Sequence, residues 1–158
     1  MLYAGEDVKF IARRIMICAS EDVGNADPQA LVVAVNAAMA VERIGMPEAR
    51  IVLSQAAVYV ACAPKSNAAY IAINCALDIV KNEKTYGVPP HLREAGYKGA
   101  KNLERGLNYK YAHDYANHYV KQQYLPDELV GTIFYEPTDN GYEATIKKHI
   151  NRIKAEAD

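Results

Sequence analysis

The sequence lacks the common phosphate-binding loops. It contains no GxxxxGK[ST], GxGxxG or GxSxG motif, and its nine glycines do not cluster. Such loops bring backbone N–H groups close to phosphates, an approach that glycine permits. If the protein takes part in nucleotide chemistry, the nucleotide is therefore bound by something outside these 158 residues.

Cysteine and histidine are scarce and scattered. The three cysteines, Cys18, Cys62 and Cys75, form no CxxC pair, and no two histidines have HExxH spacing. The odd number of cysteines argues against a disulfide framework. We therefore expect small buried thiols in a reducing compartment, and neither disulfides nor a zinc site.

Long apolar runs and an excess of one charge are also absent. The uncharged run Ile51–Pro64 has 14 residues, whereas a bilayer span needs roughly 18–20. The first residues carry acidic side chains and no basic n-region, so we expect no signal peptide, no membrane partner and a cytoplasmic location. Lys plus Arg (18) nearly balance Asp plus Glu (19), so contact with nucleic acid requires a local basic patch.

The first half shows apolar residues at helical spacing. Val8–Ala19 carries one apolar stripe, which predicts an amphipathic helix. Asp27 as N-cap and Pro28 at the first helical position predict a helix over Gln29–Ile44, which Gly45 ends. Two further helices are predicted over Glu48–Ala63 and, after the N-cap Ser66, over Asn67–Lys84.

These helices are unusually rich in alanine, with 15 alanines among the 51 residues 26–76. Small residues on almost every face let helix axes approach closely. Helices that are apolar on nearly all sides must be buried on all sides. Four helices alone do not achieve that, so the excess is covered by the second half of the chain or by another copy.

The second half has a different composition. Nine of the twelve tyrosines lie between Tyr86 and Tyr142, and glycine and proline interrupt the helical pattern. We predict an ordered loop over 85–111, a short helix over Asp114–Gln123, a small hairpin or irregular turn around Ile133–Tyr135, and a last helix over 143–155. The predicted fold is an all-α helical bundle, with a four-helix core over 1–84 and the Tyr-rich segment and last helix over 85–158, packed as one domain.

A basic, tyrosine-rich segment is the main candidate for binding. Residues 81–124 contain eight Lys or Arg and four acidic residues. The lysines and arginine could neutralise phosphates while tyrosines stack on bases. The simpler interpretation is that the tyrosines pack an irregular segment onto the helices. The candidate contacts with DNA or a partner protein are Lys98, Lys101, Arg105, Tyr109, Lys110, Tyr111 and Lys121, with Tyr119 as a further stacking candidate.

Two other groups of residues have a plain structural explanation. His113, Asp114 and His118 lie close in sequence, but histidines five apart do not share a helix face as i, i+4 metal ligands do. Ser66 follows Lys65, and adjacent helical residues do not face each other as nucleophile and base. We therefore expect no metal ligands and no catalytic residues in this chain, and Ser66 acts as a helix cap.

Eight ordered blocks resemble the C-terminal region of the replication-associated recombination protein A family (also called MgsA). These AAA+ ATPases are related to the eukaryotic Werner-helicase-interacting protein. Family members often have proline at the positions of Ala112 and Ala116. The blocks are AGEDVKFIARR (4–14), ASEDVGNADPQAL (19–31), AVERIGMPEAR (40–50), APKSNAAY (63–70), VPPHLR (88–93), YKYAHDY (109–115), QQYLPDEL (122–129) and YEPTDNGYE (135–143).

The resemblance implies a helical domain similar to the collar of clamp loaders, in a DNA-dependent ATPase that acts at stalled replication forks. ATP and Mg²⁺ would then bind upstream of residue 1, and this chain alone would not hydrolyse ATP. The family implies self-association, with a homotetramer as the expected state. The alternative is a module that binds DNA or a partner, such as the tail of a single-strand-binding protein, through the basic segment.

Overall fold

The computed structural model describes residues 1–82, 86–93, 106 and 108–156. Over these residues it contains helices and no strand, which confirms the predicted all-α class. The α-helices are α1 (Val8–Cys18), α2 (Gln29–Ile44), α3 (Ala49–Cys62), α4 (Ala68–Asn82) and α5 (Glu143–Glu156). α2 has the predicted bounds, and α1, α3 and α5 differ from theirs by a residue or so.

Contacts divide the chain into two compact units. The first contains Met1–Ala76 and Phe134–Lys148, and the second contains Leu77–Ile133 and His149–Asp158. The contacts pass from the first unit to the second within α4, and residues 134–148, from the second half of the sequence, belong to the first unit. The division into 1–84 and 85–158, packed as one domain, stays a prediction.

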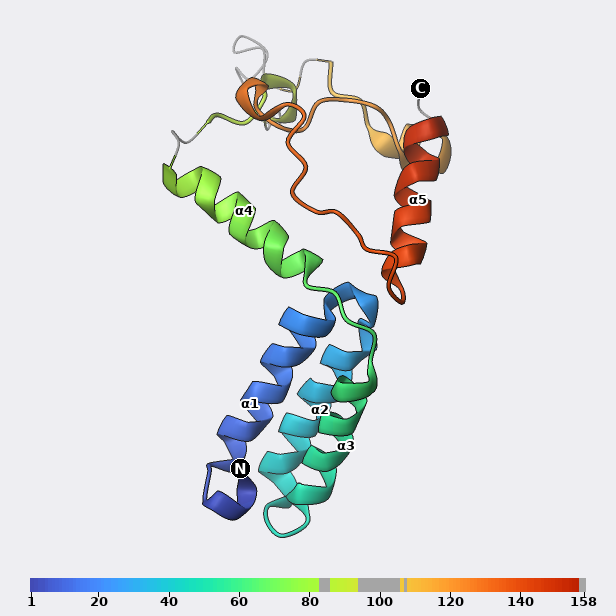
Figure 1. The fold of residues 1–158 in the computed structure, drawn as a ribbon. Coiled ribbons are helices and arrows are strands. Elements are labelled where there is room, and N and C mark those ends of the chain that lie inside the picture. Colours follow the sequence, from blue (N-terminus) through green and yellow to red (C-terminus); the bar gives the residue numbers. More distant parts are fainter. Residues whose placement is uncertain (83–85, 94–105, 107, 157–158) are drawn as a thin grey trace. The chain divides into compact units, whose positions relative to one another are not determined.

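The first unit is built on a bundle of α1, α2 and α3, which lie side by side in Figure 1. One cluster of the core joins Ile11 and Ala12 of α1 to Val41 of α2 and Leu53 of α3. A second cluster contains Ala19, Val23, Ala30, Ala34 and Val60. Alanine occupies about half of the buried positions, which lets the helices pack closely.

Local signals explain where the helices begin and end. Asp7 Oδ1 accepts a hydrogen bond from Lys9 N over 3.1 Å at the start of α1. Asp27 Oδ1 accepts from Gln29 N over 3.1 Å at the start of α2, and its other oxygen accepts from Tyr59 Oη over 2.9 Å. Gly45, at a φ of 72°, ends α2. At the start of α4, Ala68 N donates to Ser66 Oγ over 3.2 Å.

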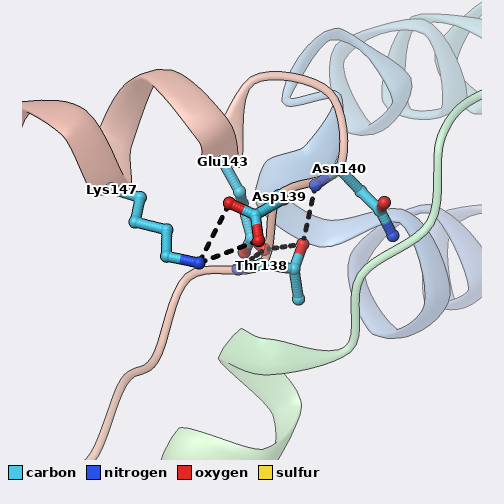
Figure 2. A network of polar contacts seen from close by, with 5 residues as sticks. All are labelled: Thr138, Asp139, Asn140, Glu143 and Lys147. Carbon is cyan, nitrogen blue, oxygen red and sulfur yellow. Dashed lines mark hydrogen bonds and ion pairs between the residues drawn. The ribbon is translucent and has the colours of Figure 1, made fainter.

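A buried carboxylate organises the turn at the start of α5. Glu143 is fully buried at the beginning of α5. Its Oε2 accepts from Thr138 N over 2.8 Å and from Thr138 Oγ1 over 2.7 Å. Figure 2 shows Thr138 facing this carboxylate, and Lys147 paired with Asp139 across the same turn.

The same turn contacts the segments that connect the bundle helices, through one backbone and one side-chain donor. Tyr142 N donates to Ala26 O over 2.8 Å, and Asn140 Nδ2 donates to Lys65 O over 2.9 Å. Gly141, at a φ of 53°, lies so close that an added Cβ would be 2.1 Å from Ala26 O. Only glycine fits both this backbone conformation and this close approach.

One prediction for the second half was wrong, and another is decided between its two alternatives. Asp114–Gln123 is not a helix: 3₁₀ turns at Ala112–Asp114 and Ala116–His118 are followed by extended backbone. Asn117 and His118 have positive φ values of 55° and 54°, which a right-handed helix does not allow. Of the two alternatives for Ile133–Tyr135, the structure shows the irregular one: the segment pairs with no strand among the described residues, and the Tyr135 side chain bonds to Glu143.

The expectation for the cysteines was also wrong in part. All three are free thiols, but Cys62 is exposed, and Cys18 and Cys75 are half-buried. None of the helices in the described part of the chain combines the length and the apolar character needed to cross a bilayer.

Candidate functional site

Helix α2 presents its smaller residues to the bundle and its larger ones to solvent. The buried set is Ala30, Ala34, Ala37 and Val41. The outward set, which is between 38% and 50% exposed, is Leu31, Val32, Val35 and Met39. Large apolar side chains are normally the buried ones. This reversal places an apolar stripe on the outer surface of α2.

Helix α3 also exposes large apolar side chains, although alanine fills only part of its buried face. Ala49, Leu53, Ala56 and Val60 are buried, whereas Ile51 and Val58 are 62% and 60% exposed. A hollow of about 380 Å³ runs between α2 and α3, and its lining includes Val32, Ala37, Val52 and Ala56. A second hollow, of about 270 Å³, lies between α1 and α2. Lys9 and Glu42 line this second hollow and form an ion pair over 3.4 Å.

Helix α4 exposes apolar side chains along most of its length. Ala68 is its one buried residue, and five larger apolar residues are exposed: Tyr70, Ile71, Ile73, Leu77 and Val80. A helix with this surface is stable in water when another element covers it. The exposed apolar residues of α2 and α3, together with those of α4 up to Ile73, all belong to the first unit, and we call them the apolar surface.

The basic candidates are only partly described. Lys98, Lys101 and Arg105 lie outside the described residues. Lys110 and Lys121 line one cavity of about 280 Å³ in the second unit, together with Tyr115 and Tyr119. Tyr109 and Tyr111 do not line this cavity and are exposed. We call it the tyrosine–lysine cavity.

A side-chain amide holds together the two segments that carry the lysines. The side chain of Gln122 bridges to Lys110 in both directions: its Oε1 accepts from Lys110 N over 3.2 Å, and its Nε2 donates to Lys110 O over 2.9 Å. This side-chain amide imitates a backbone pairing and holds the two segments together. Val120, which is buried, and Ile153 of α5 supply the apolar part of the lining.

Sequence reasoning missed one acidic member of the tyrosine–lysine cavity. Glu156, in the last turn of α5, lines it and accepts a hydrogen bond from Asn117 Nδ2. An acid in the last turn of a helix is disfavoured by the helix dipole. That unfavourable placement is the one sign in the sequence that Glu156 has a role outside its helix.

The histidines form a small aromatic stack. The His113 ring lies 5.1 Å from the Tyr111 ring and 5.0 Å from the His118 ring, between centroids. Asp114 is exposed beside them. Among the described residues, no group of three or more His, Cys, Asp or Glu could hold a metal ion.

Sequence reasoning also missed Glu143, because an acidic residue at the start of a helix is common and indicates no special role. Burial acts to raise the pKa of its carboxyl, but hydrogen bonds from Ser66, Thr138 and Tyr135 outweigh burial and hold the pKa below its usual range. Burial and the bond to Glu143 raise the pKa of the Tyr135 phenol, against a hydrogen bond with Asn25 that lowers it. The group is fully hydrogen-bonded and within the first unit, so its role is structural.

Comparison with known proteins identifies relatives over almost the whole chain. The family model "MgsA AAA+ ATPase C terminal" matches residues 1–154. An AAA domain-containing protein of Mycobacterium tuberculosis is 50% identical over 155 residues, 98% of this chain and 34% of that protein. Replication-associated recombination protein A is 45% identical in Bacillus subtilis (93% of this chain, 35% of that protein) and 46% in Escherichia coli K12 (92% and 33%). The chain thus spans about a third of the length of these relatives.

Proposed function

This chain belongs to the MgsA AAA+ ATPase C-terminal family, and we propose that it is the self-association module of a AAA+ ATPase that acts in replication-associated recombination. The relatives are about three times as long, and these 158 residues contain no P-loop. ATP and Mg²⁺ would therefore be bound by a region that precedes this one, and the chain alone would not hydrolyse ATP. A cytoplasmic location is part of the proposal.

The observation that carries the proposal is the exposure of large apolar side chains on α2 and α3. Alanines make up most of the buried face of α2, while Val35, Met39 and Ile51 are exposed. Exposing large apolar groups is unfavourable, at about 25 cal/mol for each Å². A second copy that covers them recovers this energy, and a stable contact of that kind buries on the order of 1,600 Å² or more. Four copies are the proposed state.

Charge placed on the apolar surface tests this proposal. Replacing Val35 and Met39 of α2 by Glu should dissociate the assembly, because acidic groups in an apolar contact are desolvated without a partner. The matched control is Ile133→Glu, which makes the same chemical change at an exposed residue of the second unit. Size-exclusion chromatography with light scattering measures the mass. Assemblies of equal mass in all three proteins would contradict the proposed surface.

A second candidate function is DNA binding through the tyrosine–lysine cavity. The observation that favours it is that Lys110 and Lys121 line the same cavity as Tyr115 and Tyr119. Cationic and aromatic groups together are typical of sites for single-stranded nucleic acid. A competing occupant of this cavity is an acidic peptide, such as the tail of a single-strand-binding protein. Titration of the chain with single-stranded DNA and, separately, with an acidic peptide distinguishes these two occupants.

A further inference from the structure

We propose that the tyrosine–lysine cavity takes one base of single-stranded DNA, and that Glu156 selects bases with an exocyclic amino group. Cytosine and adenine would then bind more tightly than thymine. This inference rests on the second candidate function, DNA binding, and it adds a preferred substrate class.

The size and lining of the cavity fit a flat ring. Its volume of about 280 Å³ lies just below the range typical of pockets for whole small-molecule ligands, roughly 300–1,000 Å³. Tyr115 and Tyr119 supply aromatic surface, and Val120 and Ile153 supply apolar surface. Bases of any sequence stack on such side chains, because every base has a π-face.

The charges in the cavity orient a nucleotide. Lys110 and Lys121 favour the phosphates, whereas the carboxylate of Glu156 repels them. The base edge therefore faces Glu156 while the backbone lies towards the lysines. A carboxylate accepts about four hydrogen bonds, so the bond from Asn117 leaves Glu156 able to accept from a base.

Glu156 also distinguishes among the possible occupants. The amino groups of cytosine and adenine donate hydrogen bonds, and Glu is a known partner of the cytosine amino group. Thymine presents a carbonyl oxygen at the same position, which a carboxylate cannot pair with. An acidic peptide tail offers only its backbone N–H groups and adds negative charge beside Glu156. The lining therefore favours a base over an acidic peptide.

The test is fluorescence anisotropy of the full chain with labelled dC, dA and dT oligonucleotides of equal length at one salt concentration. The wild type should bind dC and dA about five- to tenfold more tightly than dT, the effect of one good hydrogen bond. Glu156→Gln should abolish this preference, because an amide pairs with amino and carbonyl groups alike. Tyr115→Leu should weaken all three by roughly five- to 100-fold, and Tyr3→Leu, the same change at an exposed tyrosine outside the cavity, should change none.

Each negative result has its own meaning. No binding of any oligonucleotide by the wild type would overturn DNA binding as a function, and this inference with it. Binding without base preference, unaffected by Tyr115→Leu, would overturn the base subsite alone. An acidic peptide that loses affinity with Tyr115→Leu while DNA binding is unchanged would assign the cavity to a protein partner. If Tyr115→Leu fails to fold by circular dichroism, Glu156→Gln, an exposed and nearly isosteric change, decides the question.

Discussion

The hydroxyl of Tyr135 donates a hydrogen bond of 2.8 Å to Glu143 Oε1. The tyrosine lies in an irregular segment and the glutamate begins α5, so this bond joins two parts of the chain that differ in local structure. Tyr135 Oη also accepts from Asn25 Nδ2 over 3.3 Å. The pair thus connects residues 134–148 to the turn that precedes α2.

Glu143→Gln should destabilise the chain. The carboxylate accepts from Thr138 N, Thr138 Oγ1 and Tyr135 Oη, and an amide would turn a donor towards one of these donors. The expected loss is about 1–3 kcal/mol of unfolding free energy, the cost of leaving a buried donor without an acceptor. Urea unfolding measures it. Glu136→Gln, at an exposed neighbouring acid, is the control, and equal stability of the two variants would contradict the structural role of Glu143.

The pKa of Glu143 also predicts how stability depends on pH. Its folded-state pKa is lowered relative to the unfolded chain, so its contribution is present above the unfolded pKa, about 4.3. That contribution is lost as the pH falls through the still lower folded pKa. Urea midpoints of the wild type should therefore fall below about pH 4.3 more steeply than those of Glu143→Gln. Parallel curves for the two proteins would argue against the lowered pKa.

Gly141→Ala should be far more harmful than Gly131→Ala. Both glycines have positive φ, 53° and 88°, so both substitutions carry a conformational cost of about 1 kcal/mol or more. At Gly141 the new Cβ would also lie 2.1 Å from Ala26 O, whereas at Gly131 nothing lies within 4 Å. Comparison of the two thermal midpoints isolates the close approach to Ala26. Similar thermal midpoints for the two variants would mean that Gly141 does not lie close to Ala26 O.

Charge reversal of the cavity lysines should weaken DNA binding in a salt-dependent way. For each phosphate that the protein no longer neutralises, the plot of log affinity against log salt becomes shallower by about one. Lys110→Glu and Lys121→Glu should each have this effect, and Lys148→Glu, at an exposed lysine of α5 that does not line the cavity, should not. Titrations at several salt concentrations give the slopes. Unchanged slopes in both cavity variants would mean that DNA, if bound, contacts another surface.

Helix α2 could be predicted to the residue because its signals are local. Asp27 and Pro28 mark its start and Gly45 its end: Asp27 acts through its side chain on Gln29 N, and Pro28 and Gly45 act through their own backbone conformations. The segment around Asn117 could not be predicted in the same way. Whether that segment forms a helix or a loop depends on two successive residues with positive φ. Neither residue is a glycine, so the sequence gives no signal of this conformation.

The candidate sites were harder to predict because their members come from distant positions. The donors to Glu143 include Ser66 as well as Thr138, and Glu156 joins Asn117 from 39 residues away. The need to cover an apolar surface could be predicted, because the composition alone shows that these alanine-rich helices are apolar on nearly all sides. The inward position of the alanines and the outward position of Val35 and Met39 required the structure.

The mass of the wild-type chain in solution tests self-association most directly. Light scattering at micromolar concentration should give a multiple of 17.5 kDa, and about 70 kDa for the proposed four copies of 17.5 kDa. Dilution should shift this mass towards smaller species, because association depends on concentration. A single species of 17.5 kDa at every concentration would contradict the proposal that the apolar surface binds other copies of this chain.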